Sequence, residues 1–306
     1  MAAKANQSVA VAKQKTDNKK VRLSRALILP ALLFSIILTQ IPFLVTIYFS
    51  TLNWNLLKPT EIEFVWFKNY FSVFEKGDLL PATLSTVGIT SLSVILSVIL
   101  GLLLAVLLDR KFRGQALART LLITPFLLMP AAASLIWKYS MFDNNVGILS
   151  WVSQTLGMKP IEWTTDLPFM TVVIMLTWQY TPFMMLILLA GLQSQSREVL
   201  EAAAVDGAGA WRTFQWITLP HLRQYVEIAV LLGTIMLLQV FDPIAIMTKG
   251  TGGTKTLSYL LYERAFVGLN VGEAAAYGVV TVLLTIVVAT LALKNLFKVF
   301  MDGGQR

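Results

Sequence analysis

The residues of this 306-residue chain that could do chemistry lie inside apolar runs. Asp242 lies in L-L-Q-V-F-D-P-I-A-I-M-T with Gln239 one helical turn earlier, and another run carries Trp178, Gln179 and Tyr180. A carboxylate at a membrane-helix centre costs about 2.5 to 3.5 kcal/mol on insertion scales, so it usually faces a cavity or a partner. Aromatic faces and amides suit a hydroxylated, uncharged solute. We therefore predict that Asp242 and Gln239 line a solute pathway together with Trp178 and Tyr180.

Each of these residues has an ordinary structural alternative. Asp242 could be a structural anion paired at an interface, and the two aromatic side chains could pack between helices. The sequence leaves both readings open.

The sequence offers few residues for catalysis or for binding a cofactor. The chain has no cysteine and one histidine, His221, so we expect no metal cluster. Residues 249–256, K-G-T-G-G-T-K-T, are similar to a phosphate-binding loop, but that motif needs glycine directly before Lys255, where Thr254 stands. We expect no catalytic residue, and no cofactor bound by this chain itself.

Composition places these residues in a membrane. Hydrophobic residues make up 56% of the chain and charged residues 14%, which would leave a soluble globule coated with apolar surface. A helix of about 20 residues crosses the hydrocarbon core. Six stretches meet that length, and we predict one transmembrane domain over residues 26–306 with spans near 26–49, 82–108, 120–137, 169–190, 225–247 and 274–293.

Charge sets the orientation. Residues 1–25 are polar and basic, so we expect a disordered tail, and its lack of stacking aromatics argues against nucleic-acid binding. With the amino terminus in the cytoplasm, 17 of the 25 Lys and Arg residues lie on the inner side, as the positive-inside rule favours. Both termini and the loop at 191–223 are therefore predicted to be cytoplasmic.

That loop contains a polar segment at 201–220, E-A-A-A-V-D-G-A-G-A-W-R-T-F-Q-W-I-T-L-P. Helix formers predict a short helix with Ser196 as a possible cap, which Gly207 and Gly209 interrupt, and a second helix over 210–217 that Pro220 ends. Small side chains would let another surface approach the backbone. On composition alone an amphipathic connector is the alternative.

The order of residues resembles a family signature. Glu201-Ala202-Ala203, Asp206-Gly207-Ala208, Phe214, Ile217 and Leu219-Pro220 are similar to the E-A-A…D-G-A…F…I-x-L-P pattern of inner-membrane permease subunits of ABC importers, of the maltose and glycerol-phosphate uptake type. The aromatic segment 67–74, F-K-N-Y-F-S-V-F, also resembles this family. The run 249–253, K-G-T-G-G, departs from its Gly-Gly-Pro turn.

The resemblance implies an all-α polytopic fold with six transmembrane helices and a cytoplasmic coupling helix in the inner membrane. It implies that a separate ATPase, which holds the ATP and Mg²⁺, contacts Glu201, Ala202, Ala203, Asp206, Gly207, Ala208 and Pro220. A second related permease, two ATPase copies and a periplasmic or lipid-anchored solute-binding protein are the implied partners. The solute would be a sugar or polyol, and residues 263–279 look closest to permeases for sorbitol or mannitol.

Two other function classes remain. A secondary transporter would need carboxylates deep within its spans and often shows inverted repeats, but Asp242 is the one candidate carboxylate and no repeat is visible. A noncatalytic membrane scaffold would need no polar pathway.

Overall fold

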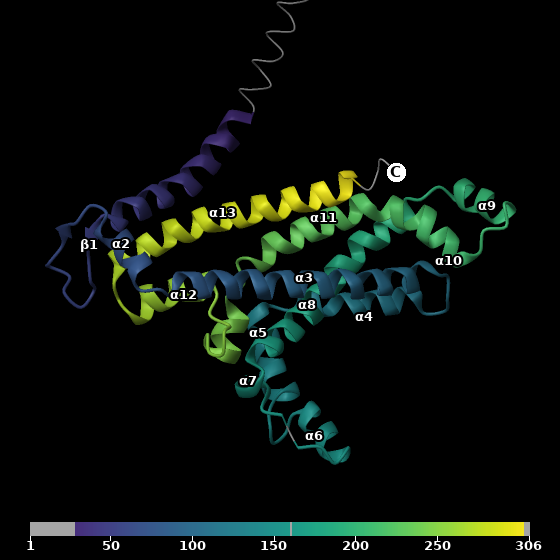
Figure 1. Ribbon diagram of the computed structural model, residues 1–306, viewed down its shortest axis with the longest axis horizontal. Coiled ribbons are helices and arrows are strands. Elements are labelled where there is room, and N and C mark those ends of the chain that lie inside the picture. The colour runs from purple at the N-terminus through teal and green to yellow at the C-terminus, as the bar shows by residue number, and fades with distance from the viewer. Residues whose placement is uncertain (1–27, 160, 303–306) are drawn as a thin grey trace, which may run out of the picture.

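The computed structural model describes residues 28–159 and 161–302, and it is mostly helical (Figure 1). The predicted tail, residues 1–25, lies outside the described residues. Two short strands, β1 (Leu52–Asn53) and β2 (Glu63–Phe64), pair antiparallel. The helices are a first helix (Ile28–Ser50), α2 (Lys68–Glu75), α3 (Leu79–Asp109), α4 (Gln115–Leu127), α5 (Pro130–Ile136), η1 (Trp137–Met141), α6 (Ile148–Thr155), α7 (Trp163–Asp166), α8 (Pro168–Gln193), α9 (Arg197–Val205), α10 (Ala210–Thr213), η2 (Phe214–Thr218), α11 (Leu219–Leu237), η3 (Ile244–Thr248), α12 (Leu257–Tyr262), η4 (Glu263–Val267) and α13 (Val271–Asp302).

The predicted all-helical membrane fold is confirmed. Within the described residues, the first helix, α3, α8 and α13 are long and apolar enough to cross a membrane, and α4 with α5 and η1 adds a fifth if that bent pair is one span. The predicted fifth span falls on α11, which does not belong to this set. Its first turns carry the polar residues His221, Arg223 and Glu227. Length and composition therefore support four of the six expected spans, or five if the bent pair is one span.

The third predicted span is broken rather than continuous. α4 ends at Leu127 and the chain turns through 100° before α5. Met129 has extended backbone because Pro130 disfavours a helical conformation in the residue before it. The freed carbonyl of Leu128 accepts a hydrogen bond from Gln179 Nε2 of α8 at 3.1 Å.

The prediction of one helix over 225–247 is also wrong. α11 begins earlier, at Leu219, and ends at Leu237, and a turn follows before the π-helix η3. Pro243 lacks the N–H that would bond to the Gln239 carbonyl, and its ring would clash with that group. Asp242 and Gln239 therefore lie at a break in the chain, and they are not one turn apart on one helix.

The core of the bundle is the pair α3 and α8. Small and hydroxylated residues of α3 face α8, and a Cβ on Gly101 would lie 2.8 Å from Met184 Cβ. Ser97 Oγ donates to the Thr177 carbonyl at 3.4 Å. Without a hydrophobic driving force between membrane helices, such small residues allow the close contact that holds them together.

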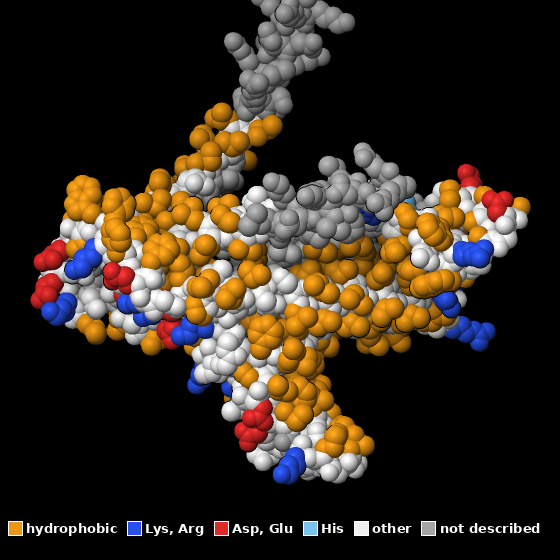
Figure 2. Space-filling view, viewed as in Figure 1, with side chains coloured by type: hydrophobic (Ala, Val, Ile, Leu, Met, Phe, Trp, Pro, Cys, Tyr) orange, Lys and Arg blue, Asp and Glu red, His pale blue; other side chains and the backbone are white. Residues whose placement is uncertain are grey.

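The bundle has two distinct ends (Figure 1). α9 and α10 lie at one end with the α3–α4 loop, and β1, α2 and the start of α13 lie at the other; we call them the α9 end and the β1 end. Residues 130–159 and 161–167, which hold α5, α6 and α7, leave the bundle sideways as an arm. Figure 2 shows charged side chains gathered at both ends and at the arm's tip, with apolar side chains between, as a membrane-spanning body requires.

Side-chain bonds fasten the β1 end. Asn69 of the aromatic segment donates to the carbonyls of Ser50 and Leu52 at 2.9 and 2.8 Å, which holds the end of the first helix against α2. Asp78, just before α3, pairs with Arg264 of η4, and its other oxygen accepts from the Tyr277 hydroxyl of α13 at 2.7 Å. These contacts lock three distant segments together.

Candidate functional site

The predicted short helix exists as α9, and its end is set by Gly207. The amide of Gly207 bonds to the Ala204 carbonyl and that of Ala208 to the Ala203 carbonyl, which is a Schellman end. Gly207 has φ +78°, a left-handed conformation that glycine adopts without steric cost. Ser196 is the N-cap residue, although its side chain makes no capping bond.

The predicted docking residues divide into exposed and buried positions. Glu201, Ala202, Asp206 and Gly207 are exposed, and Ala208 is half-buried. Ala203 is 7% exposed, so its side chain packs inside the segment and offers no surface to a partner. A Cβ on Gly207 would meet no other atom within 4 Å, so this turn points into open space.

Sequence reasoning missed the apolar part of this surface. Val205 is 88% exposed, Trp211 is 72% exposed and Trp216 is 74% exposed. Trp211 stacks on Phe214 with ring centroids 6.0 Å apart. Large apolar side chains inside a polar loop were the available signal, because exposed patches of this kind usually mark an interaction site.

Pro220 does not end the second helix, contrary to the prediction. α10 continues through the π-helix η2 into α11, where Pro220 occupies the first turn. The helical stretch accommodates this proline because the wider π turn of η2 directly precedes it. Pro220 therefore joins the segment 197–218, which we call the α9–α10 segment, directly to a bundle helix.

The base of the α9–α10 segment is bonded to both flanking helices. Ser194, after α8, bonds through Oγ to His221 Nε2 at 3.1 Å and to the Tyr225 hydroxyl at 2.7 Å. Thr218 Oγ1 donates to Gln195 Oε1 at 3.2 Å. A movement of the segment would therefore be transmitted to α8 and α11 together.

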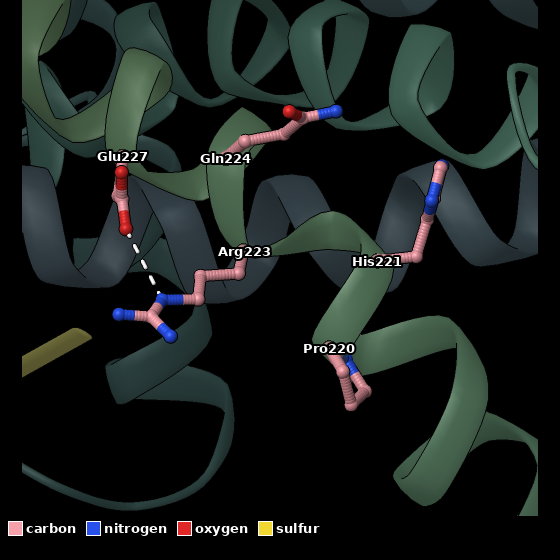
Figure 3. A pocket seen from close by; sticks show the side chains of 5 residues that line it. All are labelled: Pro220, His221, Arg223, Gln224 and Glu227. Atoms are coloured by element: carbon pink, nitrogen blue, oxygen red, sulfur yellow. Dashed lines mark hydrogen bonds and ion pairs between the residues drawn. The ribbon is translucent and has the colours of Figure 1, made fainter. Parts of the chain in front are cut away.

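A shallow cavity of about 360 Å³ lies on α11 beside this base. Figure 3 shows its lining, in which Arg223 and Glu227 point toward each other and form an ion pair at 3.3 Å. His221 points away from that pair, toward the contacts with Ser194. The charges of Arg223 and Glu227 in the cavity wall therefore balance each other within α11.

The structure brings together two of the predicted pathway residues. Tyr180 is buried in α8 and makes an edge contact with Phe126 of α4, with centroids 6.0 Å apart. Asp242 is half-buried at the break after α11 and lies close enough to act electrostatically on the Tyr180 hydroxyl. An aromatic hydroxyl of α8 and a carboxylate after α11 therefore lie within electrostatic range, with no hydrogen bond between them.

The other two pathway residues lie apart from this pair. Trp178 packs edge-on against Trp137 of η1, with centroids 5.4 Å apart, so it helps to attach the arm to α8. Gln239 is exposed in the turn after α11, with no hydrogen bond among the described residues. The packing alternative therefore fits Trp178 better than a pathway role does.

Further polar groups of α3 and α8 are buried in the core, and of these only Gln179 was noted in the sequence. Four buried side-chain atoms of α3 and α8 have no hydrogen-bond partner among the described residues: Thr90 Oγ1, Ser93 Oγ, Thr177 Oγ1 and Gln179 Oε1. Buried polar groups without partners are costly, and a solute or an adjoining helix could satisfy them. The spacing of Thr90 and Ser93 on one face of α3 was the available signal.

The glycine-rich run 249–253 is a packed turn. Thr254 is buried and bonds to Thr248 through their hydroxyls at 2.6 Å, and Gly252 lies against Pro168. Across residues 28–159 and 161–302, no group of three or more His, Asp or Glu side chains could hold a metal ion.

Comparison with known sequences gives a family match. Residues 97–298 match the model of the binding-protein-dependent transport system inner membrane component. The trehalose transport system permease protein SugA of Mycobacterium tuberculosis is 31% identical, over 93% of this chain and 91% of its own. The trehalose/maltose transport system permease protein MalF of Thermococcus litoralis is also 31% identical, over 90% of this chain and 92% of its own.

Solved structures share the fold. A bacterial ABC transporter involved in the import of the acidic polysaccharide alginate contains a chain that superposes with a TM-score of 0.75 at 18% identity, covering 94% of this chain and 99% of that one. The same kind of transporter in complex with an alginate pentasaccharide-bound periplasmic protein gives a TM-score of 0.74 at 18% identity, covering 90% and 94% of the two chains.

Proposed function

This chain belongs to the family of binding-protein-dependent transport system inner membrane components, the permease proteins of ABC importers, and from that premise we propose that it translocates a sugar or sugar alcohol through an ATP-driven complex. The observation that carries the proposal is the α9–α10 segment, which is exposed at one end of the bundle and bonded at its base to α8 and α11. ATP and Mg²⁺ would be bound by a separate ATPase chain.

The solute class follows from the relatives and from the polar groups. Two relatives are named for trehalose or maltose, and another, UgpA of Agrobacterium fabrum, for sn-glycerol-3-phosphate. Tyr180 and Asp242 offer an aromatic face and a hydrogen-bond acceptor, and the unmet hydroxyls of α3 and α8 offer further groups. Such a lining suits a neutral solute with many hydroxyl groups.

A polyol such as sorbitol or mannitol is the finer proposal, and it rests on the resemblance of residues 263–279. In the structure Glu263 of this stretch pairs with Lys255, and Tyr277 bonds to Asp78. These contacts are structural, so they support no particular solute.

In the proposed mechanism, the α9–α10 segment inserts into a groove of the ATPase. Val205, Trp211 and Trp216 supply the apolar contact area, with Glu201 and Asp206 at the rim. Closure of two ATPase copies would pull the segment, and α8 and α11 would follow through Ser194 and the η2–α11 connection. The break after α11, which carries Asp242, would then become accessible from the other side of the membrane.

A second, related permease is proposed to complete the pathway. The most apolar 18-residue window of the first helix has no residue buried within this chain, and the arm leaves the bundle sideways (Figure 1). Both are surfaces that a second subunit could cover. A periplasmic or lipid-anchored binding protein would dock at the β1 end, with both termini of this chain in the cytoplasm.

The test is uptake of radiolabelled trehalose, maltose, sorbitol and mannitol by proteoliposomes that contain the complete complex. We expect ATP-dependent accumulation of at least one solute, and no accumulation when the ATPase is inactivated. Uptake driven by an ion gradient without the ATPase would support a secondary transporter. A complex that moves no solute would support a scaffold.

A further inference from the structure

A second cavity, of about 440 Å³, lies at the α9 end where four helices meet. It lies between the ends of α3 and α8 and the beginnings of α4 and α9. Three of its lining side chains are cations and one is a carboxylate: Lys111, Arg119, Arg197 and Asp109. None of these three cations forms an ion pair with a described residue. The lining therefore carries a net positive charge, and none of its cations is held in an ion pair with a described residue.

Arg119 is fixed at the cavity by one hydrogen bond, and its Nε–H donor has no acceptor among the described residues. Its Nη2 donates to the Leu108 carbonyl at 3.2 Å, and the neighbouring Gln115 side chain donates to the same carbonyl at 2.7 Å. The Nε of Arg119 is buried and has no acceptor. A planar guanidinium fixed in this way is suited to binding phosphate oxygens, and a buried donor without a partner favours such a ligand.

The cavity opens where the chain would leave the membrane. α3 and α8 are membrane-spanning helices, and both end at this cavity. Exposed apolar side chains lie within three residues of the lining in sequence: Leu107, Phe112 and Leu117. A ligand with a phosphate group and acyl chains would use both surfaces, whereas a free phosphate would use the charge alone.

We propose that this cavity binds the headgroup of an anionic phospholipid of the inner leaflet. The phosphate lies among Arg119, Arg197 and Lys111, and headgroup hydroxyls are met by Asp109 and the glutamine side chains of the lining. Basic pockets between membrane helices on the cytoplasmic side commonly serve this purpose. Arg197 is the first residue of α9, so the bound lipid would fix the start of the α9–α10 segment and make its position sensitive to membrane charge.

The test compares two variants that lose the same charge. Lys111→Gln with Arg197→Gln removes two cations from the cavity, and Arg110→Gln with Arg113→Gln removes two from the same end without touching the lining. The complete complex is purified in detergent, and retained phosphatidylglycerol and phosphatidylcholine are measured by native mass spectrometry. We expect the cavity variant to lose phosphatidylglycerol affinity about tenfold and the control variant less than about twofold.

Equal losses in the two variants would overturn the proposal, because general surface charge would then explain retention. Millimolar inorganic phosphate that displaces phosphatidylglycerol completely would identify a soluble anion as the ligand. Phosphatidylglycerol that binds only after partner proteins dissociate would show that a protein side chain fills the cavity. An Arg197→Lys variant, which keeps the charge but loses the guanidinium, should lose an intermediate amount of lipid, and full loss without unfolding in a thermal-shift assay would contradict the charge argument.

Discussion

The two ends of the bundle differ in how their charged side chains are paired. Three ion pairs join different segments at the β1 end: Lys76 with Glu273, Asp78 with Arg264, and Lys255 with Glu263. At the α9 end, the ion pair found among the described residues is Arg223 with Glu227, one turn apart on α11. The β1 end is thus closed by its own side chains.

The α9 end leaves its charges and its large apolar side chains for other molecules. Glu201 and Asp206 are exposed beside Val205, and the basic cavity has no internal counterion within ion-pair distance. The contrast agrees with the proposal that a partner completes the α9 end, whereas ion pairs within the chain hold the β1 end. Substitutions at the two ends should therefore fail in different assays.

The largest effect is expected at Gly207. Its Cβ position is empty within this chain, so Gly207→Trp should leave the bundle intact and block the partner's approach. We expect uptake to fall at least about 30-fold, as loss of an interface hot spot does. The Gly207→Asn variant separates the effect of side-chain bulk from that of backbone strain, because asparagine tolerates φ near +78° and therefore adds a side chain with little strain.

Gly209→Ala is the matched control for that variant. Gly209 has ordinary backbone, with φ −68°, and equally open surroundings. Uptake by the Gly209→Ala variant should stay near normal. Normal uptake by the Gly207→Trp variant would remove the α9–α10 segment from the coupling mechanism.

The next largest effect concerns the pathway between the two ends. Asp242→Asn should reduce uptake about tenfold, since about 1.4 kcal/mol of solute interaction would be lost. Glu75→Gln, at an exposed carboxylate of α2, is the control and should leave uptake unchanged. Measured KM and maximal rates equal to those of the parent would assign Asp242 a structural role.

At the β1 end, the expected effect is on stability. Arg264→Gln would leave the partly buried Asp78 carboxylate without its charged partner, and we expect a loss of about 1.5 to 3 kcal/mol in the free energy of unfolding. Arg212→Gln, at an exposed cation of α10, should change stability by less than about 0.5 kcal/mol. The measurement is the thermal unfolding temperature of both variants in detergent. Equal shifts in the two variants would contradict the contrast between the ends.

The smallest effect is a pH dependence at the same place. Burial opposes ionisation of Asp78, but hydrogen bonds from Tyr277 and Arg264 outweigh it and hold the pKa of this carboxyl below 3.8. Because the folded-state pKa is depressed, the stabilisation is full above pH 3.8 and is lost as the pH falls through the lower folded value. Unfolding curves between pH 5 and 3 should show this loss in the parent protein and not in the Asp78→Asn variant, and identical slopes would contradict it.

Much of this arrangement was predictable because it depends on local chemistry. Apolar length predicted the long helices, and the residue order around Gly207 predicted the turn after α9. Pro130 removes one backbone donor within the third predicted span, but a 100° turn could not be inferred from that alone.

What was not predictable depends on tertiary contacts. Pro220 continues a helix because a π turn precedes it, and Asp242 lies within electrostatic range of Tyr180 because α11 ends before Pro243. The inward orientation of Ala203 and the outward exposure of Val205 also follow from packing, since both residues have helix-compatible, uncharged side chains.

The most direct measurement is site-specific crosslinking from Val205, and the absence of natural cysteine makes it clean. In the assembled complex, a thiol crosslinker on the Val205→Cys variant should capture the nucleotide-hydrolysing subunit, while the Leu57→Cys variant at the β1 end should not. An adduct of Val205→Cys with no ATPase, or its labelling by a membrane-impermeant thiol reagent from outside the cell membrane, would contradict the account.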